Sequence, residues 1–306
     1  MKRRKTSNKT VGIVGLGIMG GSFARNLIRS GWRVVGYDIA PARRRELAKA
    51  GVEIARDAVA VAAAAPIVIL SLPKPEALME TAKAVAAAGL PRRVIAECST
   101  FTIEDKQKAE RALRAAGHVL LDCPVSGTGA QARVGDLVVY ASGDAQGVAR
   151  MKPAFAGFSG KTYNVGAFGN GSRMKYVANH LVAINNVATA EAMVLGMKSG
   201  LDPRLIYEMV RSGAGNSRVF ELRAPMMVAN DYKSDVTMKS SVWQKDMDVI
   251  GRFARKLRAP TPLFSATLPV YAAALKRGHG NDDTAAVCAV LETKAKVKRP
   301  RRKTAR

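Results

Sequence analysis

Short apolar stretches alternate with amphipathic stretches over the first half of the chain. The apolar stretches are four to six residues long, as buried strands are, whereas the stretches between them show helical spacing of their apolar residues. The pattern predicts strands at 11–14, 33–37, 52–55, 67–72, 94–98, 119–122 and 137–141, and helices at 18–30, 41–50, 75–88, 102–116 and 145–155, with an alanine-rich helix after Asp57. Such alternation is typical of a parallel sheet covered by helices on both faces.

A different pattern begins at Gly166. A glycine-broken loop, 166–171, leads into a helical stretch that runs to Gly200 and is apolar on nearly every side. Ser172 is placed to cap the start of this helix, and Gly200 to end it. The helix would be roughly 40 Å long and buried among its neighbours, so we expect it to join two domains.

No strand pattern recurs after this helix, and helical patterns occupy 203–212, 243–257, 263–277 and 283–294. We therefore expect an α/β protein with a doubly wound parallel sheet at 11–170 and an all-helical domain for substrate binding and oligomerisation at 171–293. The acid-free, basic segments 1–10 and 294–306 are expected to be disordered tails. Without them the net charge falls from +25 to +12. Because the tails lack interleaved aromatic residues, any contact with nucleic acid should be non-specific.

The composition changes this picture little. Of the 306 residues, 48% are hydrophobic and 24% charged, as in ordinary globular proteins. Three widely spaced cysteines indicate reduced thiols, and three scattered histidines indicate no metal site. No apolar run is long enough to span a membrane. We expect a cytoplasmic protein without a metal.

A glycine motif follows the first predicted strand and opens the first helix. It reads Gly15-Leu16-Gly17-Ile18-Met19-Gly20, and Asp38 ends the next strand. In this context the motif predicts a Rossmann-type dinucleotide site, with the pyrophosphate at the helix N-terminus. Asp38 would accept hydrogen bonds from the adenosine ribose and repel a 2′-phosphate, which favours NAD, whereas the arginines at 43–45 leave NADP open.

Two later segments carry groups suited to substrate chemistry. The loop at 122–129 contains a Ser-Gly turn, which exposes N–H groups and a hydroxyl that can hold a carboxylate, although an ordinary glycine loop is the alternative. Lys175 and Asn179 share one face of the long helix. A buried lysine near a helix N-terminus has its ammonium form disfavoured, which suits proton transfer near neutral pH. The alternative is a lysine that extends to the surface.

With these motifs in order, the chain resembles the β-hydroxyacid dehydrogenases, the family of 3-hydroxyisobutyrate dehydrogenase, tartronate semialdehyde reductase and threonate dehydrogenase. The resemblance covers residues 10–293. It rests on the glycine motif, the loop at 122–127, the segment 169–179 and the pair Lys245-Asp246. It implies hydride transfer between NAD(P) and a small hydroxy acid or semialdehyde that carries a carboxylate.

The resemblance also implies roles for single residues and an assembly. Lys175 would be the catalytic acid/base. The substrate would be held by Ser126, Gly127, Thr128 and Asn179. Besides the glycine motif and Asp38, the cofactor would contact Leu72, Pro73, Thr100 and Lys245. The helical domain would form a homodimer or homotetramer.

Some positions depart from the family pattern and bear on the substrate rather than on the reaction. Thr128 stands where many members have a second glycine, His180 where a second asparagine is common, and Glu97 where an aspartate is usual. The segment 214–217 resembles the branch that acts on four-carbon sugar acids such as threonate.

Other classes remain as alternatives. One is a catalytically silent dinucleotide-binding protein that uses its basic tails on nucleic acid. A second is an imine reductase, against which Lys175 argues. A third is a decarboxylating 6-phosphogluconate dehydrogenase, which should have a much longer helical domain.

Overall fold

The computed structural model describes residues 9–299. The chain divides into two compact units, Met1–Lys175 and Tyr176–Arg306. The division falls within helix α8 (Asn170–Lys198), a few residues after the boundary expected at 170/171. Within the described residues, no helix is both long and apolar enough to cross a membrane.

A six-stranded parallel sheet forms the centre of the first unit. Its strands are β1 (Thr10–Val14), β2 (Arg33–Tyr37), β3 (Glu53–Ile54), β4 (Ile67–Leu70), β5 (Val94–Glu97) and β6 (Val119–Asp122). They lie in the order β3-β2-β1-β4-β5-β6. The order reverses between β1 and β4, the place where doubly wound sheets bind dinucleotides. The predicted Rossmann-type sheet is therefore confirmed.

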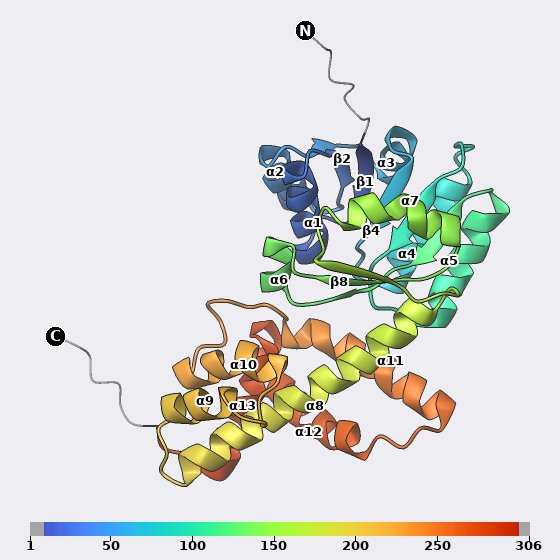
Figure 1. The fold of residues 1–306 in the computed structure, drawn as a ribbon. Helices are drawn as coiled ribbons and strands as arrows, with labels where there is room; N and C mark the ends of the chain where they lie inside the picture. Colours follow the sequence, from blue (N-terminus) through green and yellow to red (C-terminus); the bar gives the residue numbers. More distant parts are fainter. Residues whose placement is uncertain (1–8, 300–306) are drawn as a thin grey trace. The chain divides into compact units, whose positions relative to one another are not determined.

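Helices cover both faces of this sheet (Figure 1). One face carries α1 (Ile18–Arg29), α2 (Pro41–Lys49) and α7 (Ala145–Phe155), and the other α3 (Ala58–Ala64), α4 (Pro75–Ala86) and α5 (Ile103–Ala115). In the hydrophobic core beneath α1, α2 and α7, the rings of Phe23 and Phe158 stack with centroids 4.3 Å apart. Asp57 caps α3 by accepting a hydrogen bond from the N–H of Ala60, as its position in the sequence predicts.

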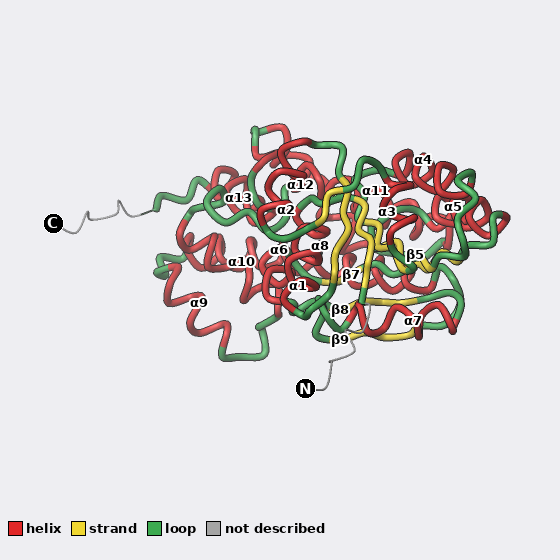
Figure 2. The backbone as a smooth tube through the Cα atoms, turned by 90° about the horizontal axis from the view of Figure 1, so that it is seen from above, coloured by secondary structure: helices red, strands yellow, loops and turns green. Residues whose placement is uncertain are grey.

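A second, three-stranded sheet follows β6. It consists of β7 (Val125–Ser126), β8 (Val138–Ala141) and β9 (Lys161–Asn164), with α6 (Gly129–Val134) inserted after β7. Figure 2 shows β8 and β9 running beside α7. Only β8 was expected. The strands β7 and β9 and helix α6 are two to six residues long, which is too short for a periodic pattern, and β9 is polar and mostly exposed.

The described part of the second unit is all-helical, as predicted. After α8 come α9 (Pro203–Arg211), α10 (Arg218–Ala229), α11 (Ser240–Leu257), α12 (Pro262–Lys276) and α13 (Val287–Ala295), with 3₁₀ turns at His279–Asn281 and Thr284–Ala286. Helix α10 was not predicted, because a charged residue, Arg223, occupies its buried face between Phe220 and Met227 and interrupts the apolar pattern. A buried pair of Arg223 and Asp283, 2.5 Å apart, holds α10 against the second 3₁₀ turn.

Helix α8 differs from its prediction at its start and on its surface. It begins at Asn170, so Ser172 is inside the first turn and is not its cap. The expected burial on all sides is also wrong, since Val177, Leu181 and Leu195 are 53%, 54% and 73% exposed. The end agrees with the prediction, because Gly200 follows the helix with a φ of +95°.

The two segments expected to be disordered extend too far in the prediction, because the residues nearest the domains belong to regular elements. Thr10 is buried in β1. Helix α13 continues to Ala295, and the guanidinium of Arg299 donates to two backbone carbonyls at the end of α10, at 2.6 and 3.1 Å. An arginine that satisfies helix C-terminal carbonyls stabilises the helix, which explains this order. The remainder of each predicted tail, 1–8 and 300–306, lies outside the described residues.

Candidate active site

The three glycines of the first loop have different surroundings. Gly15 has a φ of +91°, and a Cβ there would lie 2.1 Å from the carbonyl oxygen of Ser71. A Cβ on Gly20 would lie 1.9 Å from the carbonyl oxygen of Gly15. At Gly17, by contrast, no described atom lies within 4 Å of the Cβ position. The first and third glycines are therefore required by packing, and the second leaves open space at the N-terminus of α1, which fits a pyrophosphate.

Asp38 is tied to this loop. Its Oδ2 accepts a hydrogen bond from the N–H of Leu16 at 2.7 Å, and its Oδ1 accepts one from the N–H of Ala40 at 2.8 Å. Arg44 donates to the carbonyl oxygen of Asp38 at 3.2 Å, and Arg43 forms an ion pair with Glu46, one turn further along α2. Two of the three arginines near Asp38 thus have partners within this segment.

The loops after β4 and β5 meet at the same edge of the sheet. The N–H of Leu72 donates to the Oγ of Ser99 at 2.8 Å, which joins the two loops. Leu72 and Pro73 follow the strand next to β1, and Thr100 follows Ser99. The structure therefore brings these three expected cofactor contacts to the place where the strand order reverses.

The expected substrate loop contains a glycine with a positive φ, which other residues rarely adopt, and a threonine that caps a helix. Gly127 has a φ of +138°, and a Cβ there would lie 2.4 Å from a methyl group of Leu137. Thr128 caps α6: its hydroxyl accepts from the N–H of Gln131, whose side chain accepts from the N–H of Thr128. This capping box gives a reason for threonine in place of a second glycine. Ser126, at the end of β7, is half-buried.

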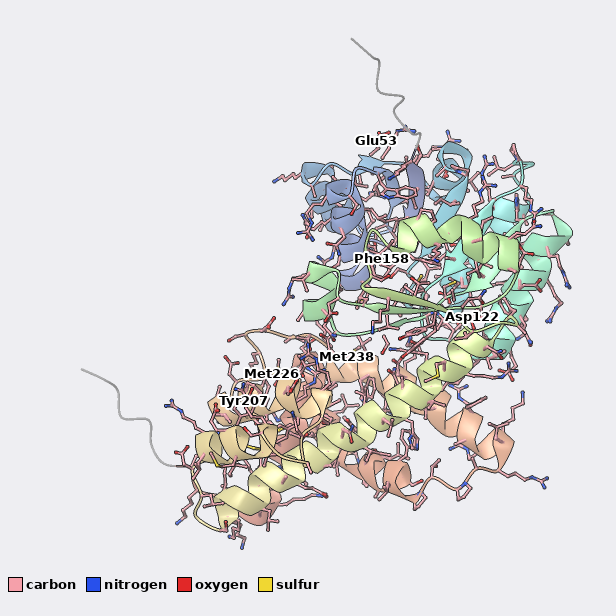
Figure 3. All side chains as sticks on the ribbon, viewed as in Figure 1. Glu53, Asp122, Phe158, Tyr207, Met226 and Met238 are labelled. Carbon is pink, nitrogen blue, oxygen red and sulfur yellow. The ribbon has the colours of Figure 1, made fainter. Side chains whose placement is uncertain are left out.

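Asp122, the first residue of this loop, holds the start of α8 (Figure 3). Its carboxylate accepts from the N–H of Ser172 at 2.7 Å and from the Ser172 hydroxyl at 2.8 Å. Close contact needs Gly171, where a Cβ would lie 2.6 Å from the carbonyl oxygen of Asp122. A carboxylate at a helix N-terminus is favourable, so Asp122 takes the part assigned to Ser172. Lys175 follows three residues later on the same helix face and is 8% exposed.

Asn179, one turn further along α8, is 4% exposed. Its Nδ2 donates to Oδ2 of Asp246 at 2.9 Å, and the Nζ of Lys245 lies 3.4 Å from Oδ1 of the same carboxylate. His180 packs on Phe264 with ring centroids 5.3 Å apart. The pair Lys245-Asp246 therefore fixes the orientation of the Asn179 amide, while the ring of His180 is held by the aromatic contact.

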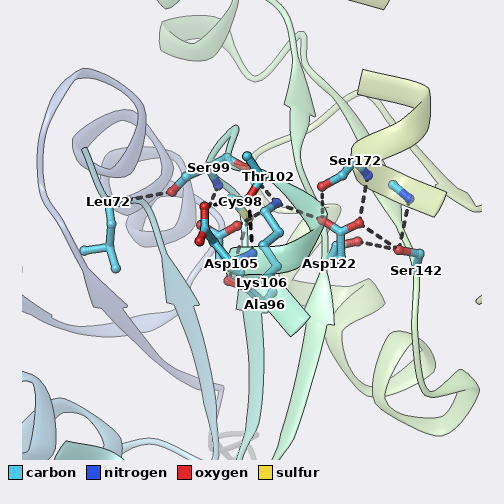
Figure 4. Close-up of polar contacts among 12 residues, drawn as sticks. Leu72, Ala96, Cys98, Ser99, Thr102, Asp105, Lys106, Asp122, Ser142 and Ser172 are labelled. Carbon is cyan, nitrogen blue, oxygen red and sulfur yellow. Dashed lines mark hydrogen bonds and ion pairs between the residues drawn. The ribbon is translucent and has the colours of Figure 1, made fainter. Parts of the chain in front are cut away.

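A buried charge cluster at the ends of β5 and β6 was missed from the sequence. Lys106 pairs with Glu97 and Asp122 at 2.7 and 2.8 Å, and all three side chains are fully buried. Figure 4 shows the contact between Lys106 and Asp122. Burial by itself would lower the pKa of Lys106, but the two carboxylates raise it above the ordinary lysine value. A signal was present, because Lys106 falls on the apolar face of α5 that contains Ile103 and Leu113.

Two family models together match nearly the whole described chain. The NAD binding domain of 6-phosphogluconate dehydrogenase matches residues 10–166, and the NAD-binding domain of NADP-dependent 3-hydroxyisobutyrate dehydrogenase matches residues 169–291. L-threonate dehydrogenase of Cupriavidus necator is 30% identical over 93% of this chain and 96% of its own. L-threonate dehydrogenase of Pectobacterium atrosepticum is 32% identical over 94% and 96%.

Solved structures agree with these matches. A 3-hydroxyisobutyrate dehydrogenase from Salmonella typhimurium superposes with a TM-score of 0.83 at 30% identity, covering 92% of this chain and 99% of its own. The enzyme of the same name from Mycobacterium tuberculosis, solved with L-serine, gives 0.82 at 29% identity over the same shares. The protein is thus an NAD(P)-dependent oxidoreductase acting on a CH–OH group, and the chain belongs to the β-hydroxyacid dehydrogenase family.

Proposed function

We propose that this protein oxidises a small hydroxy acid, with L-threonate as the first candidate, and that Lys175 is its general base. The observation that carries the proposal is the position of Lys175, which is buried in the first turns of α8. Asp122 binds the N-terminus of this helix. The substrate class is supported by relatives named L-threonate dehydrogenase and by the threonate-like segment 214–217. In this segment Ser217 caps α10 by accepting a hydrogen bond from the N–H of Phe220.

The proposed chemistry needs a proton acceptor on the protein. A bound NAD(P) would supply the hydride acceptor, and Lys175 in its neutral form takes the hydroxyl proton as the carbonyl forms. In the reductive direction Lys175 returns that proton. Ser126 and Gly127 hold the carboxylate through a hydroxyl and backbone N–H groups. Asn179 has a second amide hydrogen and a carbonyl oxygen besides its bond to Asp246, and these orient the hydroxyl or the lysine.

The edge of the sheet that bears the glycine loop would hold the dinucleotide. Gly17 would face its pyrophosphate and Asp38 its adenosine ribose. Leu72, Pro73, Thr100 and Lys245 are assigned to its nicotinamide end. Since Val177, Leu181 and Leu195 expose apolar surface on α8, we further propose a homo-oligomer in which a second copy covers them.

The direct test is cofactor reduction, followed by absorbance, with L-threonate, 3-hydroxyisobutyrate, L-serine and other hydroxy acids of two to six carbons. We expect turnover with NAD and at least one of these acids. If NADH binds but no acid is oxidised and no semialdehyde is reduced, the protein is the catalytically silent relative instead. The comparisons do not favour that alternative.

Replacing Asp38 with asparagine is expected to lower the ratio of kcat/KM for NAD to that for NADP by about ten- to a hundredfold. Asparagine keeps an acceptor for the N–H of Leu16, gives up the bond to the N–H of Ala40, and no longer repels a 2′-phosphate. The measurement is steady-state kinetics with both cofactors. Lys49→Ala, at the exposed C-terminal end of α2, is the control, and an unchanged ratio in Asp38→Asn would refute the assigned role.

A further inference from the structure

Glu97, Lys106 and Asp122 form a buried charge cluster that the proposed reaction does not use. We propose that this cluster positions the cofactor loop at 99–100 and the first turn of α8 relative to each other, with Lys106 as its positioning residue. The inference rests on the proposed function, because it takes Lys175 on α8 as the base that must be aligned.

Lys106 joins the ends of two strands through one ammonium group. Its Nζ lies 2.7 Å from Glu97 at the end of β5 and 2.8 Å from Asp122 at the end of β6. It also donates to the carbonyl oxygen of Ser99 at 2.8 Å. Two hydrogens of the ammonium thus bond Asp122 and Ser99, and Glu97 adds an ion pair at 2.7 Å.

The cluster reaches the cofactor loop at one end. Oε1 of Glu97 accepts from the N–H of Ser99 at 2.8 Å, and Lys106 binds the carbonyl oxygen of the same residue. The Oγ of Ser99 in turn accepts from the N–H of Leu72. Glu97 and Lys106 thus hold both polar groups of the Ser99 backbone, directly before Thr100. Figure 4 shows Ser99 between Leu72 and Lys106.

At its other end the cluster reaches α8. Asp122 binds the N–H and the hydroxyl of Ser172, and Ser142 bridges the backbone of Asp122 to the N–H of Gly171. Ser172 and Lys175 are three residues apart and share a helix face. A shift of Asp122 would therefore move the face of α8 that carries Lys175.

Stability alone does not explain charges at these positions. Burying such a cluster removes three ions from water, and apolar residues of similar volume often stabilise a fold as well or better. Lys106 also lies in the first turn of α5, where the helix dipole disfavours a cation, on a face that otherwise holds Ile103 and Leu113. What apolar side chains do not provide is a set of directed bonds, and here those bonds reach both functional segments.

The test separates alignment from stability with a charge-balanced variant. Lys106→Met leaves two buried carboxylates unpaired and should lower the melting temperature, whereas Glu97→Gln/Lys106→Met removes one charge of each sign and should recover most of it. We expect the double variant still to bind NADH about tenfold more weakly and to oxidise L-threonate at least about tenfold more slowly than the wild type. Lys108→Met, at an exposed position of the same helix, should match the wild type.

A double variant with wild-type melting temperature, NADH affinity and kcat would overturn the proposal. If the double variant does not fold, Ser172→Ala decides, because it removes one bond to Asp122 and no charge. That variant should lower kcat severalfold and leave NADH affinity unchanged, and an unchanged kcat would contradict the α8 half of the proposal. NADH affinity is measured without turnover. A wild type that oxidises no hydroxy acid therefore refutes the proposed function, whereas unchanged NADH affinity in the folded double variant refutes the cofactor-loop half of this inference.

Discussion

Lys175→Ala is expected to lower kcat by about 10³- to 10⁴-fold while NADH binds almost as in the wild type. Without the amine, nothing assigned to the site takes the hydroxyl proton as the hydride leaves. NADH affinity should persist because the glycine loop, Asp38 and Leu72 belong to the sheet edge, not to α8. The measurements are absorbance of NADH during turnover of L-threonate and fluorescence titration with NADH.

Two further variants sharpen this result. Lys175→Arg keeps a positive charge that is not released near neutral pH, so it should be nearly as inactive as alanine. Lys198→Ala, at the exposed end of α8, should have wild-type kcat. If Lys175→Ala loses NADH binding together with activity, the lysine supports the fold. If it keeps more than a tenth of the wild-type kcat, another group is the base.

The sequence pattern predicted the elements whose residues repeat regularly and missed those determined by single contacts. Most of the parallel strands are apolar runs, so their places and the parallel sheet followed from pattern alone. Helix α10 has the charged Arg223 on its buried face, and β7 has two residues, so neither shows an apolar period. The order of Arg299 depends on carbonyl groups at the end of α10, more than seventy residues earlier in the sequence.

The candidate site shows the same limit more clearly. Glycine spacing and the position of Asp38 locate the dinucleotide loop, because that motif is local. The partner of the α8 N-terminus is not local: Asp122 lies 50 residues before Ser172, and only the fold brings them together. The reasoning applied to Lys175, a lysine near a helix N-terminus on a buried face, applies equally to Lys106. Sequence alone could not show that Lys106 has two carboxylates as partners.

Gly17→Ala is expected to weaken NADH binding by about a hundredfold, about 2.8 kcal/mol, without unfolding the protein. Its φ of −67° suits alanine, and no described atom lies within 4 Å of the added methyl group. The loss of stability should be limited to the difference between glycine and alanine at a helix N-cap, about 1 kcal/mol. The methyl group would occupy the space into which the pyrophosphate must fit. Thermal unfolding and NADH titration check both parts.

Comparison with two other glycines makes this prediction specific. Gly20→Ala places its methyl group 1.9 Å from the carbonyl oxygen of Gly15, so it should damage folding and binding together. Gly213→Ala, whose nearest atom would be 3.8 Å away and which lies outside the sheet, should change neither. A methyl group weakens NADH binding without unfolding the protein only where the space at the glycine is needed by the ligand and not by neighbouring residues. Wild-type NADH affinity in Gly17→Ala would mean that the dinucleotide phosphates do not approach this loop.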